Sequence, residues 1–202
     1  THIEINRIDA SRTQSEVLRT LSSSCSGLAA ISILNSTFSA EDLGQLLSNL
    51  PQLRVLRLSS CRLRTNESNI GGAEWMSLQL GLRSLSISHC HGVENDSVAR
   101  LLAMMPALEE LHLADDAGGT GSIFDGEGWP FDRLTKLRRF SIASPTSDAL
   151  IQQVLTELPA LKSLELWDCQ GMRCIGWPLD KLSQIEELAF IRCENTKADS
   201  VS

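Results

Sequence analysis

A nine-residue pattern recurs along this chain and constrains its fold more than any other feature. Its clearest copy, LKSLELWDC at 161–169, has leucine at the first, fourth and sixth places and cysteine at the ninth. Three further copies keep all four places: LRVLRLSSC at 53–61, LRSLSISHC at 82–90 and IEELAFIRC at 185–193. The remaining copies keep only apolar places: LAAISILNS at 28–36, LEELHLADD at 108–116, LRRFSIASP at 137–145 and a vestige, HIEINRI, at 2–8.

The spacing inside the motif predicts a half-buried β-strand. The fourth and sixth places are two residues apart, so in an extended segment their side chains point to one face of a sheet while the fifth and seventh point to the other. One such strand cannot bury its leucines alone. Each copy therefore needs its neighbours stacked against it to enclose a continuous apolar interior.

The pattern resembles the leucine-rich repeat family, L-x-x-L-x-L-x-x-N/C-x-L, in its cysteine-containing, ribonuclease-inhibitor-like form. Successive first places lie 25, 29, 26, 29, 24 and 24 residues apart, close to the family's period of roughly 20–29 residues. The resemblance implies an α/β solenoid, or horseshoe, with a parallel β-sheet on the concave side and helices and irregular loops on the convex side. We expect residues 1–202 to form one domain of seven to eight repeats. The chain lacks an initiator methionine, and we interpret it as a piece of a longer protein.

In this family the ninth residue turns inward and bonds to loop backbone, a role that the resemblance assigns to Cys61, Cys90, Cys169 and Cys193. This placement favours buried thiols over a disulfide framework, and hence a reducing, cytoplasmic compartment. At two copies the ninth residue is Asp116 or Pro145, where we expect a distorted sheet edge. Three sequons favour the alternative, an extracellular or cell-surface location, and begin at Asn35, Asn66 and Asn95.

The connections between copies alternate in type. Three segments, at 39–51, 95–106 and 146–159, carry apolar residues at helical spacing, and the first opens with a capping-box pattern, Ser39 and Asp42. Three other connections, at 73–82, 128–137 and 176–185, each carry one tryptophan, and its recurrence at one place predicts packing behind the sheet: Trp75, Trp129 and Trp177. Two glycine-bearing insertions, 64–72 and 115–128, are predicted surface loops.

Chemistry-bearing motifs are weak, and we expect no enzyme, metal or cofactor. The run at 118–122 lacks the rest of a phosphate-binding loop, and the acidic residues of 115–127 lack calcium-ligand spacing. Strand alternation separates the side chains of 89–91 and so argues against a metal site, and a thiol ladder is preferred over a metal site at Cys169, Cys174 and Cys193. His112 with Asp115 is the one candidate for acyl transfer, without a nucleophile-elbow motif.

The predicted concave face indicates where function lies. Trp167 is the one tryptophan at an outward-pointing strand place, and interfaces are anchored by a few Trp, Tyr and Arg side chains. We predict a partner-binding site centred on it that comprises Trp167, Arg139, Glu165, Ile191, Arg192 and His112. The formal charge of −7 argues against nucleic acid, and no apolar run is long enough for membrane insertion.

The resemblance therefore implies a non-enzymatic module that recognises a protein partner within a larger intracellular receptor or adaptor. Cysteine-type arrays with helical connections are similar to those of F-box substrate adaptors and nucleotide-binding immune receptors. Neither an F-box segment nor a P-loop is present in the sequence, so a degradation adaptor and an immune sensor both stay open. The alternative is an extracellular or surface-displayed receptor ectodomain.

Overall fold

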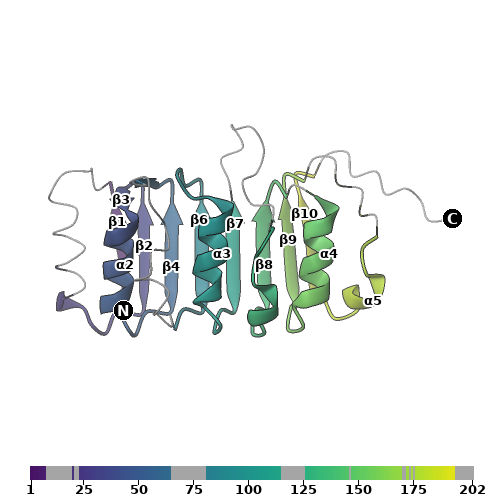
Figure 1. Ribbon diagram of the computed structural model, residues 1–202, viewed down its shortest axis with the longest axis horizontal. Helices are drawn as coiled ribbons and strands as arrows, with labels where there is room; N and C mark the ends of the chain where they lie inside the picture. The colour runs from purple at the N-terminus through teal and green to yellow at the C-terminus, as the bar shows by residue number, and fades with distance from the viewer. Residues whose placement is uncertain are drawn as a thin grey trace.

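A computed structural model gives the architecture, which is an α/β fold built on one large parallel sheet (Figure 1). It describes residues 1–7, 20, 23–64, 81–114, 126–145, 147–169, 172, 174 and 176–193. The eight strands of the sheet lie side by side in chain order: β1 (His2–Asn6), β2 (Ala30–Leu34), β4 (Val55–Ser59), β6 (Ser84–Ser88), β7 (Glu110–Ala114), β8 (Arg139–Ala143), β9 (Ser163–Trp167) and β10 (Glu187–Ile191).

Every strand occupies the third to seventh places of its motif copy, as the alternation predicts. Neighbouring strands pair without stagger, so that residues at equal places meet across the whole sheet. Fourth-place residues form one such row and sixth-place residues another, and both rows are buried in every strand from β2 to β9. The fourth-place row through the middle of the sheet is Leu56, Leu85, Leu111, Phe140 and Leu164.

Every eighth-place residue that the structure describes adopts a left-handed backbone conformation, although none is glycine. Their φ values lie between 48° and 55°, a region that costs a non-glycine residue about 1–2 kcal/mol. The conformation lets the eighth N–H donate to the seventh carbonyl of the next strand, as from Ser60 to Ser88 at 2.9 Å and from Ser144 to Trp167 at 2.7 Å. It also turns the ninth residue inward, where Ser36, Cys61, Cys90 and Cys169 are buried.

The expected distortion near Pro145 is small. The β7–β8 ladder has four residue pairs and ends at Leu113 and Ile142, whereas the other ladders of this sheet have five. Pro145 is buried and follows Ser144, whose hydrogen bond to the next strand is made as elsewhere. Asp116 lies outside the described residues.

Three helices cover one face of the sheet: α2 (Ala40–Asn49), α3 (Asn95–Ala103) and α4 (Asp148–Glu157) (Figure 1). Each lies within a segment predicted to be helical. The Ser39 hydroxyl accepts a hydrogen bond from the Asp42 N–H at 3.1 Å, and the Asp42 carboxylate accepts one from the Ser39 N–H at 3.2 Å. This reciprocal capping box is the one that the sequence predicts.

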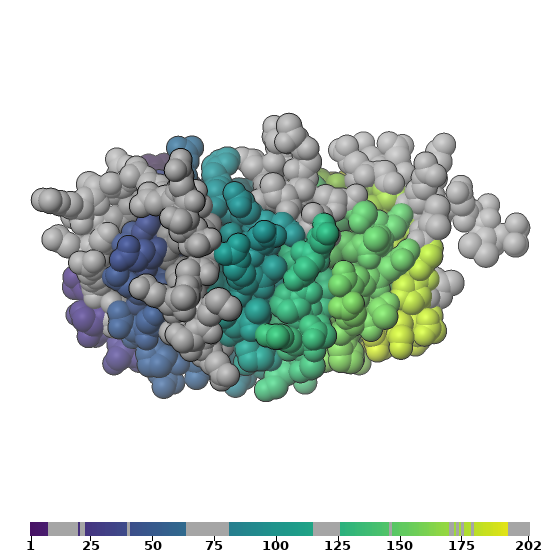
Figure 2. Space-filling model, in the orientation of Figure 1, coloured from purple at the N-terminus to yellow at the C-terminus, as the bar shows by residue number. Residues whose placement is uncertain are grey.

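The alternate connections form shorter elements on the same side, η1 (Phe131–Arg133) and α5 (Leu179–Leu182). Figure 2 shows this helix-bearing side of the molecule, with the chain running from purple at one end to yellow at the other. A second, two-stranded parallel sheet was not predicted; it pairs β3 (Thr37–Ser39) with β5 (Arg62–Arg64) just beyond the ends of β2 and β4. Among the described residues, no helix is long and apolar enough to cross a membrane.

Two of the three recurring tryptophans are buried, which confirms their predicted packing role; Trp75 lies outside the described residues. The indole N–H of Trp129 donates to the Asn95 side-chain oxygen at 2.7 Å, and that of Trp177 donates to the Asp148 carboxylate at 3.0 Å. Asn95 and Asp148 are the first residues of α3 and α4. Each tryptophan therefore links its connecting segment, by a hydrogen bond, to the first residue of the preceding helix.

The buried strand leucines should dominate stability. Leu164 has no exposed surface, and its replacement by alanine should cost about 2–5 kcal/mol of unfolding free energy. Leu188 occupies the same place in β10 but is 42% exposed, so Leu188→Ala should cost less than half as much. Reversible urea melts of the two variants measure both values. Equal losses, or a loss below about 1 kcal/mol for Leu164→Ala, would contradict the assigned register.

Candidate functional site

The face of the sheet opposite the helices, which we call the open face, presents the third, fifth and seventh places of each motif copy. Strands of a sheet lie about 4.8 Å apart, so equal places form rows of closely spaced side chains. Through β2 to β10 the fifth-place row reads Ser32, Arg57, Ser86, His112, Ser141, Glu165 and Ala189. Residues 24–29 positions apart in sequence thus become direct neighbours.

The open face differs between its two halves. Across β2, β4 and β6 its side chains are small or hydroxyl-bearing, except for Leu34, Val55 and the exposed Arg57. From β7 to β10 the face carries charges of both signs and Trp167. A shallow hollow of about 290 Å³ spans the junction of the two halves. It is lined by Arg57, Ser84, Ser86, Glu110, His112, Arg139, Ser141, Ser163 and Glu165, together with Leu85, Leu111 and Phe140.

The hollow is small and open compared with an ordinary ligand site. Small-molecule pockets usually enclose about 300–1,000 Å³, so this hollow lies at the lower limit of that range. Nine of its twelve lining residues are polar or charged, although carbon atoms form more of its surface than polar atoms do. Its form suits one or two side chains of a macromolecular partner better than an enclosed small ligand.

His112 is one of the residues that line this hollow. Its Nδ1 is 2.9 Å from the Ser141 hydroxyl. Burial lowers the pKa of the imidazole, the carboxylate of Glu165 opposes that shift, and His89 adds to it. The neutral ring is therefore the favoured form at neutral pH.

The contact between His112 and Ser141 is not arranged as a catalytic triad. Across the row the order is His112, Ser141, Glu165, so the serine stands between the histidine and the carboxylate, whereas a triad needs the histidine in the middle. Asp115, the partner that the sequence suggests for acyl transfer, lies outside the described residues. What the described geometry provides is a row of hydrogen-bonding groups.

The predicted arginines each pair with a carboxylate of the preceding motif copy. Arg139 Nη1 lies 3.0 Å from Glu110 Oε1, and Arg192 Nη2 lies 2.9 Å from Asp168 Oδ2. Both guanidinium groups are largely exposed, so each pair contributes only about 0–1 kcal/mol to stability. Such pairs orient the arginines at little energetic gain.

Trp167 lies among three of the residues predicted to flank it, and we call these four the Trp167 cluster: Glu165, Trp167, Ile191 and Arg192. The half-buried indole directs its N–H toward Glu165 Oε2 at 3.4 Å. Arg192 places its guanidinium carbon 5.9 Å from the ring centroid, within cation–π range, and Ile191 pairs with Trp167 in register.

The structure separates the other two predicted residues from this cluster. Arg139 is at the third place of β8, at the opposite end of the strands from the seventh-place Trp167, and faces Glu110. His112 is two strands away from Glu165, beside Ser141. The predicted site is thus two groups: the Trp167 cluster and the hollow around His112, with Glu165 belonging to both.

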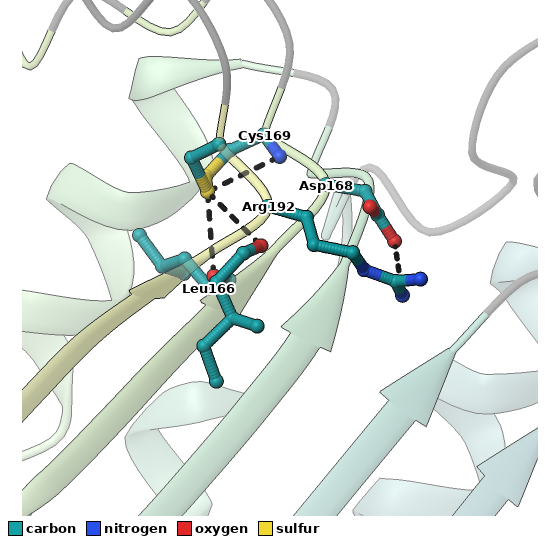
Figure 3. Close-up of a disulfide and its surroundings, with 6 residues drawn as sticks. Leu166, Asp168, Cys169 and Arg192 are labelled. Atoms are coloured by element: carbon teal, nitrogen blue, oxygen red, sulfur yellow. Dashed lines mark hydrogen bonds and ion pairs between the residues drawn. A yellow bond between two sulfur atoms is a disulfide. The ribbon is translucent and has the colours of Figure 1, made fainter.

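A disulfide between Cys169 and Cys193 corrects the prediction that all ninth-place cysteines are free thiols. Figure 3 shows it beside the Asp168–Arg192 ion pair. The Cα atoms are 4.7 Å apart, because unstaggered pairing makes these cysteines neighbours. The Cys193 sulfur lies 3.4 Å from the Leu166 carbonyl oxygen, but a disulfide sulfur carries no hydrogen to donate there. It instead accepts from the Cys169 N–H at 3.4 Å.

Cys25, Cys61, Cys90 and Cys174 are free thiols. In the described part of the chain, no three His, Cys, Asp or Glu side chains gather closely enough to hold a metal ion. This includes the run 89–91, whose side chains alternation was predicted to separate. The 118–122 run and three of the four acidic residues considered for calcium lie outside the described residues.

The lowered pKa of His112 predicts how the unfolding free energy changes with pH. Because the folded-state pKa lies below the unfolded value, the unfolded chain binds the proton more readily. The contribution of His112 is therefore fully present above about pH 6.5 and declines as pH falls through the folded-state pKa. NMR titration should place this imidazole below its ordinary pKa.

A His112→Gln variant keeps a polar side chain that cannot titrate. Its unfolding free energy, measured by urea melts at the same pH values, should therefore lack this pH-dependent contribution. A His112 pKa at or above the ordinary value, or identical pH slopes in the two proteins, would contradict the described burial.

A scan against models of known protein families found none that matches this chain. The features that bear on function are the motif, the register and the side chains of the open face. These give a polar hollow and an aromatic cluster on one open sheet face.

Proposed function

We propose that this chain is a non-enzymatic protein-recognition module of the leucine-rich repeat type, whose open face is the concave surface of a solenoid. Its support is the agreement between the motif and the sheet: the seven near-copies and the vestige at 2–8 each contain one of the eight strands, at the same places. In such an array the strand face is held rigid by the core, and its outward residues are available for selection of a partner.

The Trp167 cluster is the observation that carries the recognition proposal. It combines a half-buried aromatic ring, an aliphatic neighbour, a cation over the ring and a carboxylate, all on one face. Buried aromatic and arginine side chains supply most of the binding energy at protein interfaces. The charges here are paired locally, which favours specific salt-bridged recognition over bulk electrostatic capture.

The hollow around His112 is the second contact region. Its hydroxyl groups and neutral imidazole offer directional hydrogen bonds, and Glu165 links it to the Trp167 cluster. A partner that inserts an apolar or aromatic side chain beside Trp167 and a polar side chain into the hollow would use both. The net charge of −7 supports a protein partner over a nucleic acid.

Two settings for such a module remain proposals. The first is a larger intracellular receptor or adaptor, in which another domain acts on the selected partner. The second is an extracellular or cell-surface receptor ectodomain, and the Cys169–Cys193 disulfide favours it.

One of the three sequons is engaged within the protein. At Asn95 the side-chain amide donates to the Glu127 carbonyl at 2.9 Å while its oxygen accepts from Trp129.

Removal of the Trp167 ring tests the recognition proposal. We expect Trp167→Ala to lower the unfolding free energy by less than about 1 kcal/mol, since the ring is on the open face, and to weaken a partner tenfold or more. The measurement is affinity capture from an extract of the native cells with quantitative mass spectrometry, followed by titration of the captured protein. The matched control is Arg133→Ala, which removes an exposed long side chain from η1 on the helix side.

A partner that binds wild type and Arg133→Ala but not folded Trp167→Ala would support the proposal. Equal binding by all three would place recognition elsewhere. Substantial unfolding of Trp167→Ala would assign the ring to the core.

A further inference from the structure

Two free cysteines, Cys61 and Cys90, occupy the same relative positions as the disulfide-bonded pair. Both are ninth-place residues of consecutive motif copies, and they follow β4 and β6, which pair without stagger. The His91 N–H donates to the Cys61 carbonyl at 2.8 Å, so the alignment of the two chains continues past the strand ends. Cys169 and Cys193 follow β9 and β10 in the same way.

The surroundings of the sulfurs are also the same. Cys61 Sγ lies 3.3 Å from the Ser59 carbonyl oxygen and 3.3 Å from that of Ile33, on the preceding strand. Cys193 Sγ lies 3.5 Å from the carbonyl oxygen of Ile191, two residues before it, and 3.4 Å from that of Leu166 on the preceding strand. A ninth-place sulfur therefore occupies one environment in both the thiol and the disulfide state.

The two free thiols are hydrogen-bonded to each other. The hydrogen bond from Cys90 lowers the pKa of Cys61 to about 7, and the same contact, together with burial, raises the pKa of Cys90. The pair therefore releases one proton near neutral pH and retains the other. A thiolate beside a thiol is the state from which disulfide exchange proceeds.

We propose that Cys61 and Cys90 are a redox modification site that forms a second, reversible disulfide by exchange with a low-molecular-weight disulfide. The Cys61 thiolate attacks one sulfur of the small disulfide and releases one small thiol after protonation. The Cys90 thiol then loses its proton and attacks the Cys61 sulfur of the mixed disulfide, which releases the second small thiol. Two cysteines are oxidised, and one small disulfide is reduced to two thiols.

Burial does not exclude this reaction. Cys61 and Cys169 are both 0% exposed, yet Cys169 is in a disulfide. Exchange at either pair needs a transient opening at the strand ends. The product would tie β4 to β6 beneath the hydroxyl-bearing half of the open face, as Cys169–Cys193 ties β9 to β10 beneath the Trp167 cluster.

The other two free cysteines provide an internal comparison. Cys25 and Cys174 are half-buried and so more accessible, but they are not ninth-place residues on paired strands. Burial raises the pKa of the Cys174 thiol, and the nearby Asp148 carboxylate raises it further. Exposure to a small disulfide should give these two cysteines mixed disulfides at most.

Peptide mapping of the full chain tests the proposal. The folded protein is incubated with glutathione disulfide, its remaining thiols are blocked with N-ethylmaleimide, and it is digested without reduction. We expect one new linked peptide that joins residues 61 and 90, with the mass of the two peptides less two hydrogens. Dithiothreitol should restore both thiols, and the oxidised protein should melt at a higher temperature.

Cys61→Ser and Cys90→Ser are the matched variants, and neither should form a link or gain in melting temperature. The wild-type map decides the question even if a variant folds poorly. Separate glutathione adducts on Cys61 and Cys90, complete blocking of both by N-ethylmaleimide, or a link from either to Cys25 or Cys174 would overturn the proposal. These outcomes are independent of partner binding, so they leave the proposed function untouched.

Discussion

Parallel pairing without stagger is the constraint on which the rest of this structure depends. It converts each place of a nine-residue motif into a straight row across eight strands. The left-handed eighth residue maintains that alignment, because its N–H continues the hydrogen-bond ladder while the chain turns. The energetic cost of this conformation is offset by the hydrogen bond and by burial of the ninth residue.

The same rows determine the chemistry of both faces. Fourth- and sixth-place rows form the apolar interior, and the ninth-place row brings cysteines together in pairs. On the open face, neighbouring strands bring opposite charges together, as at Glu110 and Arg139. The side chains that meet on this face are therefore set by the register: Trp167 pairs with Ile191, and Arg192, the next residue, reaches the Trp167 ring.

Much of the fold could be predicted from the sequence, because the signals are local. Period-two alternation within the motif gives the strands, and Ser39 with Asp42 gives the start of a helix. The β3–β5 sheet could not be predicted in this way, since its three-residue strands carry no alternation long enough to recognise. Only the proximity of the two motif ends produces it.

The sequence predicts which residues of the candidate site share one face, but only partly which of them lie close together. Alternation places Trp167, Glu165 and His112 on one face, but the distance between Arg139 and Trp167 depends on which end of the strand each occupies. The proximity of Cys169 and Cys193 could be predicted, because both are ninth-place residues of adjacent motif copies. That signal does not determine redox state, because Cys61 and Cys90 have the same spacing and are free thiols.

Site-specific photo-crosslinking tests most directly the central claim that the open face contacts a protein. A photoreactive amino acid at Ala189, which pairs with Glu165 in register, probes this face, and one at the exposed Glu157 of α4 probes the helix side. Our account predicts that a partner in an extract of the native cells crosslinks to position 189 and not to position 157. Crosslinking of the same partner to position 157 alone would contradict it.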